Sequence, residues 1–322
     1  MKEATVQFYD ELPDNADLRA EVLQGLGTHP RRLSPKFFYD RRGSELFDAI
    51  CRVPEYYITR TETAILQNNA AALARLAGTR TVLIELGSGA SQKVRLMLDV
   101  LRPYAYVGVD ISKDFLLQST RRLAAAYPWL KVHAVCADFC QPLSLTCCPP
   151  QFKRVAFFPG SSIGNFEPQH AVLFMRQLQS VLGPTGALVI GVDLKKDPHH
   201  LNAAYNDAQG VTAEFNLNIL RRMQRELGAQ VDIRGFRHEA FYNEAHGRIE
   251  MHLVSQRTQQ IRIDNEAFHF EKNERMHTEN SYKYTIEEFQ ALARDAGYQP
   301  HTVWTDEKRL FSVHYLQVEN RD

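Results

Sequence analysis

A short glycine-containing segment, Glu85-Leu86-Gly87-Ser88-Gly89-Ala90, has the residue types of a turn that binds a small molecule. It follows an apolar, β-branched run and precedes helical spacing, so it predicts a turn between a buried strand and a helix. Glycine permits a tight turn and lets a ligand approach the backbone closely. A dinucleotide-binding fingerprint would have a third glycine at position 92 to help present backbone donors to pyrophosphate, and Gln92 stands there instead. The turn therefore favours a ligand without pyrophosphate.

Acidic residues follow the next two strand-like runs. Asp110 ends the first of them, where its carboxylate can accept hydrogen bonds from both hydroxyls of an adenosine ribose. Asp138 and Phe139 follow the second, and they pair an acceptor for the adenine amino group with a ring that can pack on the base. Taken singly, each acid could be an exposed strand end. The ordered set, with Glu85 and the glycines, fits adenosine without phosphates and predicts S-adenosylmethionine as the cofactor, with S-adenosylhomocysteine as its product.

The elements that position these residues alternate along the first two thirds of the chain. Apolar runs separated by helical segments indicate βα units and a parallel sheet covered on both faces, hence an α/β fold. The expected strands are 81–86, 105–110, 131–136, 154–158 and 186–193. The expected helices are 64–77, one that begins near residue 92, 114–126 and 170–182.

The pattern changes after residue 197, where a long amphipathic helix is expected at 213–227. Three alternating runs then indicate an antiparallel meander: 248–255, 259–264 and 267–271. A helix and two strand-like runs, which could return to the first sheet as an antiparallel edge pair, close the chain: 285–296, 299–304 and 310–317. No repeat or Pro/Gly-rich linker separates these regions, so the second region is expected to be an insertion. The predicted domains are 1–195 with 283–322, and an inserted α+β domain at 196–282.

The composition is typical of a globular protein with reduced cysteines. Lysine plus arginine equals aspartate plus glutamate, 38 against 38, so a nucleic-acid or membrane partner is disfavoured. The segment 1–18 has no apolar core and no later run is long enough to span a bilayer, so we expect a cytoplasmic protein. Five irregularly spaced cysteines suit free thiols. His133, Cys136 and Cys140 lack the second pair of a tetrahedral site, so no metal is expected.

Several motifs, in order along nearly the whole chain, resemble those of one known family. They are FFYD at 37–40, GSELFD at 43–48, PEYY at 54–57, TRTE at 59–62, ELGSG at 85–89, GSSIGNF at 160–166, AYND at 204–207, GVTAEFN at 210–216 and WTDE at 304–307. The family is that of the histidine-specific methyltransferases, which make the trimethylated histidine of ergothioneine biosynthesis. So many dispersed motifs in one order argue against a chance match.

The resemblance implies a Rossmann-like class I methyltransferase domain interrupted by a family-specific α+β substrate-recognition domain, in agreement with the organisation above. It also implies that the cofactor site is lined by Gly87, Lys93, Asp110, Asp138 and Phe139. Lys93 has a simpler alternative as a solvated residue in the first turn of its helix.

Methyl transfer from a sulfonium to nitrogen needs a neutral amine whose lone pair is aligned behind the methyl group. The protein therefore mainly positions and desolvates the amine and lets a proton leave. The resemblance implies that Tyr39, Phe47 and Gly160 surround the reacting nitrogen, where aromatic faces can accommodate cationic products. It implies that Asn165 and Tyr205 hold the α-amino and carboxylate groups by hydrogen bonds.

The imidazole end of the substrate would meet Tyr56, Glu279 and Ser281, with Met251 packed nearby. A carboxylate suits an imidazole N–H donor. The implied reaction is methylation of the α-amino nitrogen of L-histidine, three times, to the betaine hercynine. Without the resemblance, Tyr56 could simply cover a helix and Glu279 could lie on a solvated strand edge. Tyr282, directly after Ser281, departs from the smaller residue of close relatives.

Three alternatives stay open. The same fold could methylate the α-amine of another amino acid, such as tyrosine or a tryptophan derivative, although Glu279 and Ser281 argue against this. A nicotinamide-dependent oxidoreductase is disfavoured because the third glycine is missing. A non-catalytic binding module would have to explain a complete set of cofactor and amine-site residues. We expect the chain to act as a monomer.

Overall fold

The structure is a computed structural model that describes residues 6–11, 16–89 and 91–319. The chain forms two compact units, each assembled from separate stretches of sequence. Unit 1 contains the described residues of 1–12, 58–195 and 282–322, and unit 2 contains those of 13–57 and 196–281. Within the described residues, no helix combines the length and apolar character that crossing a membrane requires.

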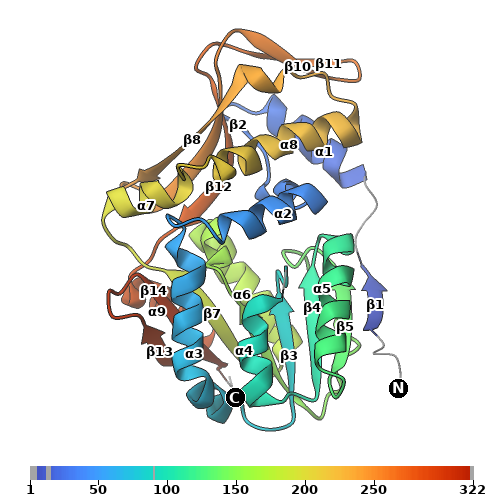
Figure 1. Ribbon diagram of the computed structural model, residues 1–322, viewed down its shortest axis with the longest axis vertical. Coiled ribbons are helices and arrows are strands. Elements are labelled where there is room, and N and C mark those ends of the chain that lie inside the picture. Colours follow the sequence, from blue (N-terminus) through green and yellow to red (C-terminus); the bar gives the residue numbers. More distant parts are fainter. Residues whose placement is uncertain (1–5, 12–15, 90, 320–322) are drawn as a thin grey trace. The chain divides into compact units, whose positions relative to one another are not determined.

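Unit 1 is built on an eight-stranded sheet with the order β1-β5-β4-β3-β6-β7-β14-β13 (Figure 1). The strands are β1 (Val6–Asp10), β3 (Thr81–Leu86), β4 (Ala105–Asp110), β5 (Lys131–Cys136), β6 (Lys153–Phe158), β7 (Ala187–Asp193), β13 (Tyr298–Thr305) and β14 (Phe311–Val318). Neighbours from β1 to β7 pair in parallel, and β14 pairs antiparallel with both β7 and β13. Because β3 lies between β4 and β6, the strand order reverses beside it. Ligands of open α/β sheets bind at the carboxyl ends of the strands at such a switch point.

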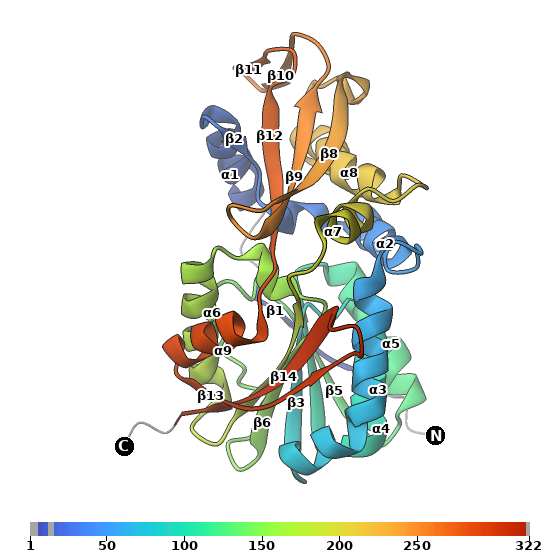
Figure 2. The same cartoon turned by 90° about the vertical axis from the view of Figure 1, so that its left-hand side faces the viewer.

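Helices cover both faces of this sheet (Figure 2). One face carries α3 (Tyr57–Ala77), α4 (Gln92–Leu101) and α5 (Lys113–Ala126); the other carries α6 (Pro168–Leu182) and α9 (Ile286–Asp295). Every residue of β3, β4 and β7 is consequently buried, which explains their uninterrupted apolar sequences. Helix α9 begins with a capping box, in which Thr285 Oγ1 accepts from Glu288 N (3.1 Å) and the Glu288 carboxylate accepts from Thr285 N (2.8 Å).

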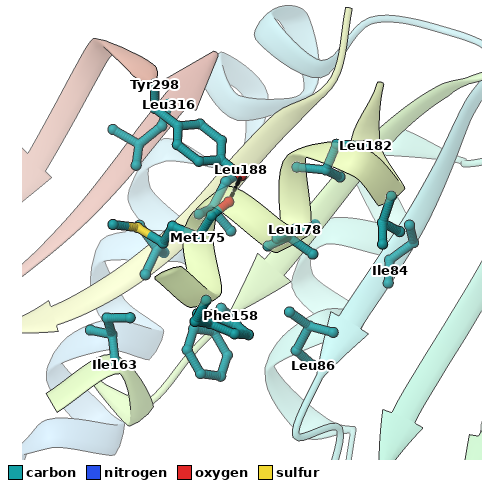
Figure 3. Packing of buried hydrophobic residues seen from close by; sticks show 14 of the residues in the cluster. Ile84, Leu86, Phe158, Ile163, Met175, Leu178, Leu182, Leu188, Tyr298 and Leu316 are labelled. Carbon is teal, nitrogen blue, oxygen red and sulfur yellow. Dashed lines mark hydrogen bonds between the residues drawn. The ribbon is translucent and has the colours of Figure 1, made fainter. Parts of the chain in front are cut away.

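The main core of unit 1 lies between the sheet and the helices that cover its α6 face (Figure 3). Met175 and Leu178 of α6 pack with Phe158 and Leu188 of the strands. The hydroxyl of Tyr298 in β13 donates to the carbonyl oxygen of Met175 at 3.0 Å. This bond satisfies a buried phenol and attaches β13 to α6.

Unit 2 contains a four-stranded sheet with the order β2-β12-β9-β8 and a separate two-stranded hairpin. The sheet strands are β2 (Arg31–Arg32), β8 (Phe236–Asn243), β9 (Arg248–Ser255) and β12 (Arg275–Tyr282), and the hairpin is β10 (Gln259–Ile263) with β11 (Glu266–Phe270). The helices are α1 (Ala16–Gly27), α2 (Arg41–Ile50), α7 (Pro198–Tyr205) and α8 (Val211–Leu227). Short 3-10 turns are η1 (Pro35–Phe38) and η3 (Ile233–Gly235) here and η2 (Ser162–Asn165) in unit 1.

The predicted α/β alternation is confirmed, with the bounds of β3, β4 and β5 as expected. The two C-terminal strands also join the first sheet as an antiparallel edge pair. The predicted meander is wrong, because β10 and β11 pair only with each other in the described sheets, whereas β9 pairs with β8 and β12.

The division into units differs from the predicted domains at the N-terminal side. The sequence places residues 13–57 with 1–195, whereas the structure groups their described part with the inserted segment. Two contacts account for this: Arg31 in β2 pairs in parallel with Met276 of β12, and Asn218 Nδ2 of α8 donates to Asp40 Oδ1 at 2.9 Å. At the other boundary, Tyr282 belongs to unit 1 rather than to the insertion.

Candidate active site

The glycine turn after β3 is fastened to the end of β4. Gly87 and Gly89 have φ angles of 66° and 46°, in the left-handed region that glycine adopts without strain. The N–H of Gly87 donates to the carbonyl of Val109 at 2.9 Å, and the N–H of Gly89 donates to Asp110 Oδ2 at 2.9 Å. The turn and Asp110, predicted to bind the same ligand, therefore lie together.

Both carboxylate oxygens of Asp110 have backbone donors. Oδ2 accepts from Gly89 N, and Oδ1 accepts from Ser112 N at 2.9 Å. Burial raises the pKa of Asp110, and the hydrogen bonds from Ser112 and Gly89 oppose that rise. A carboxylate oxygen can accept more than one hydrogen bond, so each oxygen keeps acceptor capacity for a ligand hydroxyl. This geometry fits the predicted ribose contact.

Phe139 lies beside the glycine turn. A Cβ atom added at Gly87 would be 3.7 Å from the ring of Phe139, and that ring packs edge-to-face on Phe158 with 5.5 Å between centroids. Asp138 starts the same loop, and its Oδ1 accepts from Cys140 N at 2.9 Å. The structure thus brings Phe139 to the turn and gives Asp138 a role in shaping the loop.

Glu85 supports the turn from inside the sheet. Its side chain lies in β3, is 2% exposed, and accepts a hydrogen bond from the Tyr106 hydroxyl at 2.5 Å. Burial raises the pKa of Glu85 to about 8, partly offset by the Tyr106 bond and the charge of Lys93. Tyr106 also lies 3.2 Å from Ser91 Oγ in the residue before α4. Glu85 therefore contacts protein groups that hold the turn in place.

Lys93 and Gly160 are linked by the buried carboxylate of Glu62, which belongs to the TRTE motif and for which the sequence predicted no role. Glu62 of α3 is fully buried and forms an ion pair with Lys93. The N–H of Gly160 donates to both oxygens of Glu62, at 3.0 and 2.9 Å. Gly160 has a φ angle of 80°, and Asn165 ends the 3-10 turn η2 that follows it. The sequence signal for Glu62 was only an acidic residue among apolar residues at helical spacing.

An aromatic group in unit 2 contains two of the residues predicted to surround the reacting nitrogen. Tyr39 packs edge-to-face on Phe47, with 5.8 Å between ring centroids. Phe215 of α8 contacts both rings, at 5.7 and 6.1 Å, and was not predicted as a site residue although it lies in the GVTAEFN motif. Phe47 in turn packs edge-to-face on Tyr56 at 6.4 Å.

Polar residues continue from this aromatic group. Tyr56 packs on Tyr205 at 6.3 Å, and the Tyr205 hydroxyl donates to Ser281 Oγ at 2.8 Å. Burial raises the pKa of Tyr56 well above its usual range, and the charges of Tyr205 and Glu279 add to that rise. Glu279 and Ser281 are 8% and 3% exposed. The structure therefore brings together the predicted residues Tyr56, Tyr205, Glu279 and Ser281.

Met251 lies on β9, the neighbour of the strand that carries Glu279 and Ser281. It is 1% exposed, and its carbonyl accepts from Thr278 Oγ1 at 3.1 Å. In β12, His277 Nε2 lies 2.8 Å from Asn280 Oδ1. Side chains three residues apart point to opposite faces of a regular strand, so this contact marks a break in the alternation of β12.

A hydrogen-bond network fixes Tyr205 to the sheet of unit 2. Thr278 Oγ1 donates to Asn216 Oδ1 at 2.8 Å, and Asn216 Nδ2 lies 2.9 Å from His238 Nδ1. His238 Nε2 lies 2.9 Å from the carbonyl oxygen of Tyr205. Because the amide donates to Nδ1 and the carbonyl accepts from Nε2, the network assigns His238 to the neutral Nε2–H tautomer. Burial lowers the pKa of His238, which agrees with that neutral form.

The described residues contain no group of three or more histidine, cysteine or acidic side chains that could hold a metal ion. His133 and Cys136 both lie on β5, a strand whose residues are buried after Lys131. Burial raises the pKa of Cys136 to about 12, so its thiol stays protonated at neutral pH.

Comparison with known proteins places the chain among methyltransferases. Residues 18–318 match the family model described as histidine-specific, S-adenosylmethionine-dependent methyltransferase. The chain is 40% identical over 296 residues to "Histidine N-alpha-methyltransferase" of Mycolicibacterium smegmatis, covering 90% of this chain and 91% of that protein. The protein of that name from Mycobacterium tuberculosis is 40% identical over 302 residues, 92% of this chain and 93% of that one. "Ergothioneine biosynthesis protein 1" of Neurospora crassa is 32% identical over 285 residues, which cover 86% of this chain and 32% of that protein.

Proposed function

The chain belongs to the family of histidine-specific, S-adenosylmethionine-dependent methyltransferases, and we propose that its substrate is the α-amino nitrogen of L-histidine. It is an N-methyltransferase that uses S-adenosylmethionine. We further propose three successive transfers that yield the betaine hercynine, for use in ergothioneine biosynthesis. The likeness to a fungal protein named for ergothioneine biosynthesis supports this place in metabolism.

Five residues of unit 1 are proposed to bind the cofactor: Gly87, Lys93, Asp110, Asp138 and Phe139. When bound, the cofactor supplies a methyl group on a sulfonium sulfur. Asp110 fits the ribose because backbone donors already orient both of its oxygens, at 2.9 Å each, without exhausting their capacity. Phe139 fits the adenine because its ring lies beside the turn at Gly87.

The proposed work of the protein on the amine is to orient it, exclude water and let its proton leave. Tyr39 and Phe47 are suited to the nitrogen because aromatic faces attract the cation that forms as methyl groups accumulate. Their ring contacts with each other and with Phe215 support this role, since a ring held by neighbours keeps its orientation. In unit 1, Gly160 and Asn165 are proposed to contribute a backbone group and a side-chain amide to the same reacting end.

One observation carries the choice of histidine: a buried polar set in unit 2 that can pair with an imidazole. Glu279 offers a carboxylate to a ring N–H, and Ser281, held by Tyr205 at 2.8 Å, offers a hydroxyl. Tyr56 and Met251 would cover the ring. Buried polar groups left unpaired by a smaller or apolar side chain cost free energy, so such a set rejects other amino acids.

The test replaces the two polar partners of the ring. In Glu279→Val/Ser281→Thr we expect kcat/KM for histidine to fall at least roughly a hundredfold, while aromatic amino acids become relatively better substrates. Methyl transfer is measured by mass spectrometry with each of the twenty amino acids supplied separately. Affinity for S-adenosylhomocysteine, measured by calorimetry, is the control and should not change. A double variant that keeps full histidine preference would place imidazole recognition elsewhere.

The number of transfers has its own test. Nα-Methyl- and Nα,Nα-dimethylhistidine should both be substrates, and free histidine should end as the trimethyl product at completion. Product analysis showing methyl groups only on ring nitrogens would reject the proposed orientation of the substrate.

A further inference from the structure

Glu62 is a carboxylate removed from water inside unit 1. Its side chain is fully buried on α3, and it accepts from Gly160 N through both oxygens, at 3.0 and 2.9 Å, while pairing with Lys93. The opposite wall is also adapted to it, because a Cβ atom at Gly191 of β7 would lie 2.0 Å from Glu62 Oε1. The sequence thus leaves space for this carboxylate in the middle of a packed domain.

A buried charge is a poor way to stabilise a fold. Removing a carboxylate and an ammonium from water costs free energy that their attraction often fails to recover, and apolar residues of similar volume commonly do as well. Both partners of Glu62 are residues proposed to act on the ligands: Lys93 in the cofactor site and Gly160 at the reacting end. A carboxylate that touches these two residues is suited to fixing their positions.

The positive charge of Lys93 determines which ligand groups it can bind. An ammonium only donates hydrogen bonds and has three of them to give. The Lys93 side chain is 16% exposed, whereas Glu62 is 0% exposed, so the lysine is the member of the pair that reaches toward solvent. The single anionic group of the methyl donor is the α-carboxylate of its methionine part, and adenosine carries none.

We propose that Glu62 is a positioning residue of the cofactor site, whose carboxylate holds the Lys93 ammonium in place for the methionine carboxylate of the donor and fixes the Gly160 peptide. The inference rests on the cofactor residues of the proposed function and is independent of the histidine assignment. Glu62 acts through Lys93 and Gly160 and does not itself contact the ligand.

The test compares two ligands that differ in the methionine tail. S-Adenosylhomocysteine has the tail, and 5′-methylthioadenosine has the adenosine and sulfur without the carboxylate. In Glu62→Gln, calorimetry should show roughly tenfold or weaker binding of S-adenosylhomocysteine, the scale of one charge-assisted hydrogen bond, with methylthioadenosine affinity within about twofold of the parent. Unchanged binding of both ligands, or an equal loss for both, would overturn the proposal.

A double-variant cycle separates positioning from general support of the fold. Lys93→Met should show the same selective loss and should also lower thermal stability, because Glu62 is left buried without its counter-ion. Adding Glu62→Gln to Lys93→Met should restore stability and weaken S-adenosylhomocysteine binding no further. Fully additive losses of affinity would overturn the proposal. If the Glu62→Gln variant does not fold, the two ligands are compared instead in the double variant Glu62→Gln/Lys93→Met, in which both members of the pair are neutral.

Glu250→Gln is the matched control. Glu250 is also a buried carboxylate, 8% exposed and paired with Arg248 at 2.8 Å, but it lies in unit 2 and outside the proposed cofactor residues. Both affinities should stay unchanged in this variant. No amino-acid substrate is added in any of these measurements, so their result does not depend on whether histidine is the substrate.

Discussion

Asp110→Asn exchanges one carboxylate oxygen for an amide NH₂ while keeping the shape of the side chain. In the parent, each oxygen accepts one backbone donor at 2.9 Å, from Gly89 and from Ser112. An asparagine can satisfy only one of them, because its NH₂ group faces the other backbone N–H in either orientation of the amide. The substitution therefore disturbs the turn and the predicted ribose contact together.

The magnitude follows from these two losses. A hydrogen bond to a charged group contributes about 1.5–3 kcal/mol, so affinity for S-adenosylhomocysteine should fall roughly 10- to 150-fold. The unfolding free energy should change less, because the neutral amide relieves the desolvation that raises the pKa of Asp110 and so offsets part of the cost of the unpaired N–H. Affinity, not stability, is the discriminating quantity.

Calorimetric titration with S-adenosylhomocysteine at pH 7.5 measures the affinity, and circular dichroism establishes that the variant is folded. Methylthioadenosine should lose affinity to a similar degree, since the ribose is common to both ligands. A folded Asp110→Asn protein with parent affinity would refute the assignment of Asp110 to the ribose.

Two further predictions concern stability. Because burial raises the pKa of Glu85 from 4.5 to about 8, the folded state binds a proton more tightly than the unfolded state, and this contribution to stability is lost as pH rises from about 4.5 through about 8. The loss amounts to about 1.4 kcal/mol per pH unit in that window. Urea titrations at pH 5 and pH 8 should therefore show that the free energy of unfolding falls more between these pH values in the parent than in Glu85→Gln. An equal fall in the two proteins would count against the buried, protonated carboxyl group. Gly43→Ala should destabilise the protein by about 1–3 kcal/mol, because its Cβ atom would lie 1.6 Å from the carbonyl oxygen of Phe38 and the backbone must move. Thermal denaturation checks this, and an unchanged midpoint would contradict the close approach at Phe38.

The predictable part of the fold is the part with strong local signals. Strands β3 and β4 are buried at every residue, so their sequences are continuous apolar runs whose ends are marked by glycine or aspartate. The glycine turn and Asp110 could be predicted for the same reason, since a ligand turn between a buried strand and a helix is a local pattern.

Elements whose sequences carry no local pattern could not be predicted. Strand β12, Arg275–Tyr282, is polar and breaks its alternation between His277 and Asn280, so it has no period-two signal. The two residues of β2 are a strand only because β12 pairs with them. Glu62 and Phe215 were missed as site residues for a similar reason: their significance lies in which side chains they contact, and only the folded chain shows this.

The order in which the strands occur along the chain has a consequence for biosynthesis. Strand β12 lies between β2 and β9 in its sheet, and β14 pairs with β7, yet both strands are made after these partners. Until residues 275–318 leave the ribosome, β2 lacks the partner with which it pairs and β7 presents an open edge. Unpaired strand edges favour aggregation, so chains terminated before β12 should require chaperones or be degraded rather than survive as a smaller enzyme.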